Sequence, residues 1–202
     1  MERQAHWETV YGTRTEDAVS WFQESPTVSM DLIARVAAPG SAILDVGGGA
    51  SRLVDRLVAA GYRMTVLDIA DAALAQARAR MGDAAQSVDW IVADVTDWRP
   101  PRQFDVWHDR AVFHFLVDAA DRRAYVAAAS EAIPEGAHAI IGTFAPDGPE
   151  RCSGLPVRRY DPEALAAEFG PGFERAEDLR HDHVTPSGAI QRFQFTVLRK
   201  VT

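Results

Sequence analysis

Short apolar runs alternate with helical stretches between residues 41 and 144, and this rhythm limits the possible folds more than any other feature of the chain. The helical stretches are amphipathic or rich in Ala, and they end at Gly or Pro-Gly signals. Strands separated by helices form parallel βαβ units, whose sheets bind ligands at the carboxyl ends of the strands. We therefore expect an α/β domain with helices on both faces of a sheet. The expected strands are 41–46, 62–67, 88–93, 104–107 and 137–144, and the expected helices are 51–60, 71–81 and 119–133.

Both ends of the chain depart from this rhythm. Two further strand-like runs, 173–184 and 191–201, are separated by about six residues, whereas a parallel crossover needs a dozen or more. They predict an antiparallel hairpin beside five parallel strands. Residues 1–40 look helical and carry several aromatic side chains. We expect a single domain over 1–202, with 1–40 as a helical cap on a core formed by 41–202.

Composition excludes several classes of protein. The net charge of −8 argues against sequence-independent nucleic-acid binding, which needs a cationic face. No apolar run reaches the length of about 18 residues that a membrane span needs, and the start of the chain does not resemble a signal peptide. The single cysteine, Cys152, rules out an internal disulfide and fits a reducing cytoplasm. No Cys or His spacing predicts a metal site.

A glycine-rich turn follows the first expected strand, in the segment Asp45-Val-Gly-Gly-Gly-Ala-Ser51. Glycines at such a place let the backbone turn sharply and approach a ligand, and the next helix adds partial positive charge. An ordinary tight turn is the alternative, but three consecutive glycines after an aspartate make it less probable. The dinucleotide pattern G-x-G-x-x-G fits poorly, because Arg52 stands at its third glycine. Asp45 would also repel a pyrophosphate, whereas it suits an ammonium group.

Two more aspartates end the next two expected strands. Asp68 lies 23 positions after Asp45, where an acidic side chain can accept both hydroxyls of a ribose. Asp94 ends the third strand, where a carboxylate can accept from the exocyclic amine of an adenine. Each aspartate alone is more often a helix cap or a solvated loop residue. Together with the glycines they predict a pocket for an adenine, a ribose and an amino-acid ammonium.

These residues resemble the motifs of class I S-adenosylmethionine-dependent methyltransferases. Asp45-x-Gly47-x-Gly49 resembles the first motif of that family, Asp68 the second, and Ala93-Asp94-Val95 the third, although Ser51 replaces the usual third glycine. The resemblance implies a Rossmann-like methyltransferase fold and S-adenosyl-L-methionine as cofactor. By this resemblance the methionine part lies on Asp45, Gly47, Gly48 and Gly49, the ribose on Asp68 beside Ile69, and the adenine on Asp94 and Val95.

The segment after the expected fourth strand, which contains Asp109, Arg110 and His114, is the candidate acceptor site. Asp109-Arg110 looks like the pair found there in thiopurine methyltransferases and in small lysine methyltransferases. The resemblance implies roles for Asp109 and Arg110 in catalysis and for Asp109 beside the cofactor. Alternatively, Asp109 and Arg110 form an ion pair that caps a helix and contributes little. His114 is expected as a general base, and the alternative is a histidine packed in the core.

Trp7 and Tyr11 resemble the N-terminal aromatic residues that close over the cofactor in the same two branches. Packing of a leading helix against the sheet is the alternative. The long loop 145–156 after the fifth strand is a further place for acceptor contacts, through residues such as Arg151, Cys152 and the nearby Tyr160.

We expect a cytoplasmic methyltransferase that acts on a small molecule, because the chain adds no separate substrate domain. A protein-lysine methyltransferase is the alternative, with nearly equal support from Asp109-Arg110. Two further alternatives belong to other functional classes. One is a protein that binds the cofactor without catalysing a reaction, and the other, less favoured, is a dehydrogenase. The sequence identifies neither the acceptor nor the oligomeric state.

Overall fold

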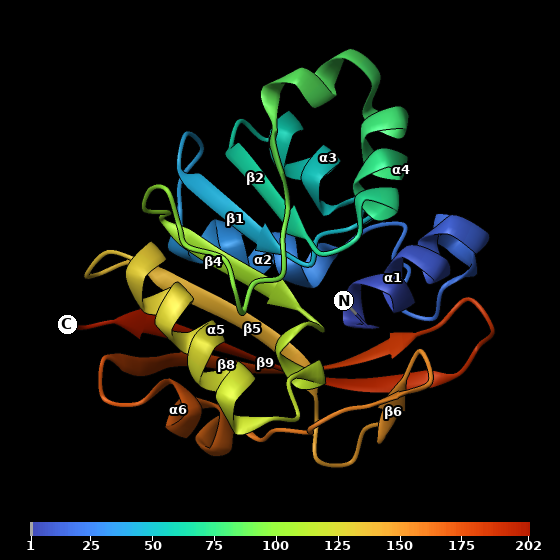
Figure 1. The fold of residues 1–202 in the computed structure, drawn as a ribbon. Coiled ribbons are helices and arrows are strands. Elements are labelled where there is room, and N and C mark those ends of the chain that lie inside the picture. Colours follow the sequence, from blue (N-terminus) through green and yellow to red (C-terminus); the bar gives the residue numbers. More distant parts are fainter. Residues whose placement is uncertain (1) are drawn as a thin grey trace.

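The computed structural model describes residues 2–202, which form one seven-stranded sheet with helices on both faces (Figure 1). The strand order is β3-β2-β1-β4-β5-β9-β8; the first five are parallel, and β9 and β8 are antiparallel to their neighbours. The expected Rossmann-like fold with its terminal hairpin is therefore confirmed. The strands are β1 (Ala42–Val46), β2 (Arg63–Asp68), β3 (Asp89–Val92), β4 (Val106–Arg110), β5 (His138–Phe144), β8 (Phe173–Val184) and β9 (Ile190–Lys200).

The helices cover the sheet in two groups, each with its own apolar core. One core holds Ile43 and Val66 with Leu57 and Leu74, and the other holds Leu44 with side chains such as Tyr125 and Leu165. Adjacent residues of β1 therefore serve opposite faces, as the pleat of a strand requires. The helices are α1 (Glu2–Thr13), α2 (Thr27–Val36), α3 (Leu53–Ala59), α4 (Asp71–Met81), α5 (Ala119–Ala132) and α6 (Pro162–Phe169), with short 3₁₀ turns η1 (Glu16–Ala18), η2 (Gly82–Ser87) and η3 (Phe113–Phe115).

Two segments differ from the expectation: the fourth strand and the loop that follows the fifth strand. We expected the fourth strand at 104–107, but β4 runs over Val106–Arg110, so that Asp109 and Arg110 lie inside it. Asp109 pairs with Val46 of β1 and with Ile141 of β5, and pairing on both sides of the strand overrides the polar composition of the segment. The loop 145–156 also contains a short antiparallel pair, β6 (Arg151–Cys152) and β7 (Leu155–Pro156).

The N-terminal segment lies beyond the carboxyl ends of the parallel strands, with α1 beside the tips of β1 and β4 (Figure 1). Glu8 accepts hydrogen bonds from the backbone N–H groups of Asp71 and Ala72 at 2.8 and 3.1 Å, and so caps the start of α4. The Gln76 amide donates to the Tyr11 carbonyl at 2.7 Å. These contacts fix α1 over the edge where ligands bind in such sheets. Within residues 2–202, no helix has the length and apolar character needed to cross a bilayer.

Candidate active site

The turn after β1 needs glycine for reasons of packing as well as conformation. Gly47 and Gly49 have φ angles of 65° and 49°, in the left-handed region that favours glycine. A Cβ atom on Gly47 would lie 2.0 Å from a Val112 methyl group, and one on Gly48 would lie 2.6 Å from Val66. The turn therefore presses against the sheet and the segment after β4, and it forms one wall of the site.

Asp45 belongs to a buried hydrogen-bonded chain. Its Oδ1 atom lies 2.7 Å from Nδ1 of His108, and Nε2 of His108 lies 2.9 Å from the Ser29 hydroxyl. Each of the three residues is at most 2 % exposed. His108 therefore fixes the orientation of the Asp45 carboxylate, which lines a cavity beside the glycine turn.

Asp68 is buried at the end of β2. Its Oδ1 atom accepts a hydrogen bond from the Ala70 N–H at 2.8 Å. Burial raises the pKa of this carboxyl to about 7, and the charge of Asp45 adds to the shift. The second oxygen faces the space in front of Gly49, because a Cβ atom there would lie 3.1 Å from both that oxygen and the Tyr11 hydroxyl. The oxygen is well placed to accept hydrogen bonds from a ligand over the turn.

Asp94 follows β3 and is partly committed to protein groups. Its oxygens accept from the Arg3 guanidinium at 3.0 Å and from the backbone and hydroxyl of Thr96 at 3.0 and 2.7 Å. Arg3 also pairs with Asp121 of α5. Arg3 was not among the residues expected from the sequence, where only its charge near the start of the chain could have pointed to it. Asp94 therefore has a cationic partner from α1 within the site.

Two adjacent cavities lie over these strand ends, and both are lined by Tyr11, Trp21, Gly47 and Arg110. The first cavity extends towards β2 and β3, and the second lies between the glycine turn and the segment that leads into α2. Most of the expected cofactor residues divide between them, whereas Gly49 and Asp109 line neither. The first is also lined by Trp7, Asp68, Ile69, Asp94 and Val95, and the second by Asp45 and Gly48.

Aromatic side chains of the N-terminal segment cover the first cavity. The ring of Trp7 lies 5.1 Å from that of Phe115 and 5.7 Å from that of Trp21, in edge-to-face contacts. The indole N–H of Trp21 donates to the Tyr11 hydroxyl at 3.2 Å. These side chains pack on one another and also line the cavity, so the arrangement fits both alternatives for this segment, closure over the cofactor and packing alone.

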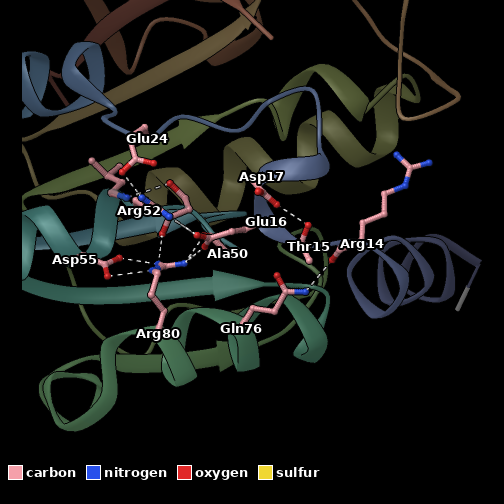
Figure 2. Close-up of polar contacts among 12 residues, drawn as sticks. Arg14, Thr15, Glu16, Asp17, Glu24, Ala50, Arg52, Asp55, Gln76 and Arg80 are labelled. Atoms are coloured by element: carbon pink, nitrogen blue, oxygen red, sulfur yellow. Dashed lines mark hydrogen bonds and ion pairs between the residues drawn. The ribbon is translucent and has the colours of Figure 1, made fainter. Parts of the chain in front are cut away.

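An ionic cluster fastens the same segment to the core. Figure 2 shows Glu16 of η1 between Arg52 and Arg80, which approach it from the start of α3 and from α4. Arg80 also pairs with Asp55 at 2.6 Å, and Arg52 pairs with Glu24. These charged groups link the cap to the helices that follow β1 and β2.

The structure places Asp109 outside both cavities. Its two oxygens accept from the backbone N–H groups of Val112 and Phe113 at 2.8 and 3.0 Å and from the Tyr125 hydroxyl at 2.6 Å. It is 0 % exposed, and burial raises the pKa of its carboxyl to about 6. In these contacts Asp109 caps the η3 turn, as in the helix-cap alternative, and its expected roles in catalysis and cofactor binding stay predictions.

His114 is also enclosed in the core rather than in the cavities. Its Nδ1 atom accepts from the Phe144 N–H at 3.3 Å, and the ring packs against Phe115 and Phe144. Burial, with the nearby Arg110, lowers the pKa of His114 to about 3. A histidine with this pKa is a weak base at neutral pH, so the packed-core alternative fits its surroundings better than the expected base does.

Arg110 is the member of the expected acceptor set that reaches the cavities. Its Nη1 atom donates to the Trp21 carbonyl at 3.0 Å, and the guanidinium lies 4.6 Å from the centre of the Phe193 ring. From the loop after β5, Cys152 lines the first cavity, whereas Tyr160 packs in the core against Phe113. Among residues 2–202 no group of three metal-ligating side chains is close enough to hold an ion.

Known proteins share both the sequence pattern and the fold. A family model described as a methyltransferase domain matches residues 43–136, which run from β1 to the turn before β5. Residues 43–136 therefore match a methyltransferase domain. The strand order places Asp45, Asp68 and Asp94 of this chain at the ends of three adjacent strands, as the sequence motifs predict.

Relatives of this chain include nodulation protein S of Rhizobium tropici, which is 27% identical over 122 residues, or 60% of this chain and 51% of that protein. The chain therefore spans about half the length of the curated relatives it matches. Among solved structures, the 1,6-didemethyltoxoflavin-N1-methyltransferase of Burkholderia thailandensis superposes with a TM-score of 0.76 at 22% identity, covering 100% of this chain and 90% of the other. The N-methyltransferase NodS of Bradyrhizobium japonicum has a TM-score of 0.73 at 14% identity, covering 96% and 97% of the two chains.

Proposed function

We propose that this protein transfers a methyl group from S-adenosyl-L-methionine to a small-molecule acceptor by in-line displacement. The observation that carries the proposal is the group of carboxylates Asp45, Asp68 and Asp94 on adjacent strand ends, around a glycine turn and under an aromatic cover. Hydroxyl and amine donors of an adenosine and an ammonium group match these acceptors. NodS and the toxoflavin methyltransferase have been crystallised with S-adenosylhomocysteine, which supports the same cofactor here.

The residues present fit that cofactor. Asp68 would accept from the ribose hydroxyls beside Ile69, Asp94 and Val95 would hold the adenine, and Asp45 with Gly47, Gly48 and Gly49 would hold the methionine part. Trp7 and Tyr11 would exclude water from above. The bound cofactor supplies an electrophilic methyl group on a sulfonium.

Alignment is the main catalytic contribution that this site offers. Holding an acceptor in line with the methyl group can supply on the order of 7 kcal/mol. Arg110 faces the cavities and is the residue that we propose to contact the acceptor. For Asp109 and His114 we propose a positioning role, because their contacts hold the segment after β4, from which Val112 and Phe115 reach the cavity.

We favour a small acceptor over a protein lysine. The first cavity is enclosed by Trp7, Trp21 and Phe115, which leave it suited to a compact molecule. The toxoflavin methyltransferase was solved with its small acceptor bound, which supports the same class here. The net charge of −8 disfavours nucleic acid as the acceptor, and the buried thiol of the lone Cys152 suits the cytoplasm, where we propose the protein acts.

Labelling of a cell extract tests this function. The protein is incubated with methyl-labelled S-adenosylmethionine and a lysate, and the products are separated by size. We expect label in molecules smaller than about 1 kDa, of the size that one enclosed cavity accepts. Label that appears in protein would support the lysine alternative, and the Asp68→Ala variant shows which products depend on this enzyme.

A further inference from the structure

Arg110 carries a buried positive charge that forms no ion pair with an acidic side chain of residues 2–202. Its Nε and Nη2 atoms are buried and have no hydrogen-bond partner among residues 2–202, and no carboxylate of those residues lies within 4.0 Å of its guanidinium. The other arginines that line the cavities, Arg3 and Arg52, are each paired with two acidic residues. Buried cations are normally paired, so the free N–H groups of Arg110 indicate a missing anion.

Asp45 acts on the charge of Arg110 only at longer range and lies 2.7 Å from His108, so it does not pair directly with Arg110. Burial raises the pKa of the neighbouring Cys152 thiol to about 11, which keeps it neutral. His114, His181 and His183 have pKa values lowered by burial and by Arg110, so they are neutral as well at pH 7. The neutral neighbours therefore leave the charge of Arg110 available to a ligand.

The position of Arg110 separates it from the expected adenosine site. The expected ribose and adenine carboxylates, Asp68 and Asp94, follow β2 and β3, whereas Arg110 ends β4 and reaches over Phe193 of β9. In the sheet order, β9 lies on the far side of β4 and β5 from β2 and β3. A ligand on the free N–H groups would therefore lie on the side of the site opposite to the adenosine.

Among residues 2–202, no histidine with a free ring nitrogen lines these cavities, and the carboxylates Asp45, Asp68 and Asp94 are the ones proposed to hold the cofactor. His108, which lines the second cavity, has both ring nitrogens engaged by Asp45 and Ser29. His114 and Asp109 are enclosed away from the cavities. An acceptor that is already negatively charged would need no base, because a base acts only where a proton has to be removed.

We propose that the acceptor is an anion whose charged group binds the free Nε and Nη2 groups of Arg110; this rests on the proposed function. The anionic atom forms a bond to the methyl carbon while the carbon–sulfur bond breaks and its electron pair stays on sulfur. An anion and a sulfonium give two products with no proton moved. Carboxylates and thiolates share this chemistry.

Binding of three ring compounds of similar shape tests the proposal. Calorimetry on the protein loaded with S-adenosylhomocysteine compares benzoate, thiobenzoate and the neutral benzamide. We expect both anions to bind at least tenfold more tightly than benzamide, and the difference to disappear in Arg110→Gln. Arg110→Lys should keep part of it, and Arg56→Gln, a change at an exposed arginine of α3, should keep all of it. Binding of benzoate but not thiobenzoate, or the reverse, identifies the kind of anion.

A second measurement separates this role from contact with the carboxylate of the cofactor. Arg110→Gln should bind S-adenosylhomocysteine within about threefold of the unchanged protein. A tenfold loss for that compound, with unchanged binding of methylthioadenosine, which lacks the amino-acid part, would assign Arg110 to the cofactor and overturn the proposal. Equal binding of anions and benzamide, or no binding of any of the three, would overturn it as well. If S-adenosylhomocysteine itself did not bind the unchanged protein, the proposed function would fail instead.

Discussion

At the scale of single residues, Asp68 combines a functional position with a cost in stability. We predict that Asp68→Asn weakens the binding of S-adenosylhomocysteine at least tenfold. The reason is that a hydrogen bond to a charged group contributes about 1.5–3 kcal/mol. Calorimetry measures the loss, and Asp71→Asn, at the exposed start of α4, is the matched control. Unchanged affinity would show that Asp68 does not hold the ribose.

The same substitution should alter the dependence of stability on pH. The pKa of Asp68 is raised from 3.8 to about 7 by burial, so between these values the folded protein holds a proton that the unfolded chain has released. Asp68 therefore makes its full contribution to the free energy of unfolding below pH 3.8, and this contribution is lost as the pH rises through 7. A difference of one unit between the folded and unfolded pKa corresponds to about 1.4 kcal/mol.

We accordingly expect Asp68→Asn to melt at a higher temperature than the unchanged protein at pH 8, and to gain less or nothing at pH 5. Thermal melts at the two pH values measure the difference. Asp109, whose pKa is also raised, is present in both proteins and cancels in the comparison. An equal shift at both pH values would mean that Asp68 is ionised throughout.

Asp109 should affect stability more than cofactor binding. We predict that Asp109→Ala lowers the free energy of unfolding by about 2–4 kcal/mol, because it leaves the buried N–H groups of Val112 and Phe113 without acceptors. Denaturant titration measures the loss, and affinity for S-adenosylhomocysteine should stay within about threefold. Tyr125→Phe keeps both backbone contacts of Asp109 and leaves one buried donor, the Trp107 indole N–H, without its acceptor, so it should cost less. A variant with normal stability but lost turnover would restore the catalytic role expected from the sequence.

At the scale of elements, the N-terminal segment is held by charges as well as by aromatic packing. Glu16 contacts both Arg52 and Arg80, and all three side chains are less than a third exposed (Figure 2). We predict that Glu16→Gln increases the rate of protease cleavage within the first ~25 residues several-fold, because local opening becomes easier. Glu24→Gln, at a side chain that is 70% exposed, is the control and should have little effect.

Bound ligand should restore the protection of the N-terminal segment from protease if that segment covers the ligand. S-adenosylhomocysteine should slow cleavage in both the unchanged protein and Glu16→Gln, since a ligand that binds the closed form stabilises it. Cleavage that is equally fast with and without the ligand would favour packing of the helix as the only role of Trp7 and Tyr11.

At the scale of the whole molecule, thermal stability should distinguish S-adenosylhomocysteine from NAD as a ligand. S-adenosylhomocysteine at 100 times its Kd should stabilise the folded state by about 2.7 kcal/mol. For a chain of this size that raises Tm by roughly 5–10 °C. NAD should leave Tm unchanged, because Arg52 interrupts the dinucleotide pattern and Asp45 would repel a pyrophosphate. Stabilisation by NAD would instead support a dehydrogenase, the least favoured alternative from the sequence.

The sequence alone determined the fold and the cofactor motifs. Alternating apolar runs and helices fix a parallel sheet because each element has to bury one face, and the six-residue connection fixes the antiparallel hairpin. Asp45, Asp68 and Asp94 could be predicted to meet because parallel strands bring their carboxyl ends to one edge. These inferences need only local periodicity and the geometry of a sheet.

Only the tertiary structure decided which polar residues near the end of β4 face the cavities. Asp109, Arg110 and His114 are all polar, so the sequence does not separate them. Both oxygens of Asp109 accept hydrogen bonds from protein groups, and His114 is buried and accepts from the Phe144 N–H. Arg110 alone of the three reaches the cavities with unpaired N–H groups. Sequence spacing cannot give that distinction, because it depends on contacts with β1, β5 and α5 that lie far apart along the chain.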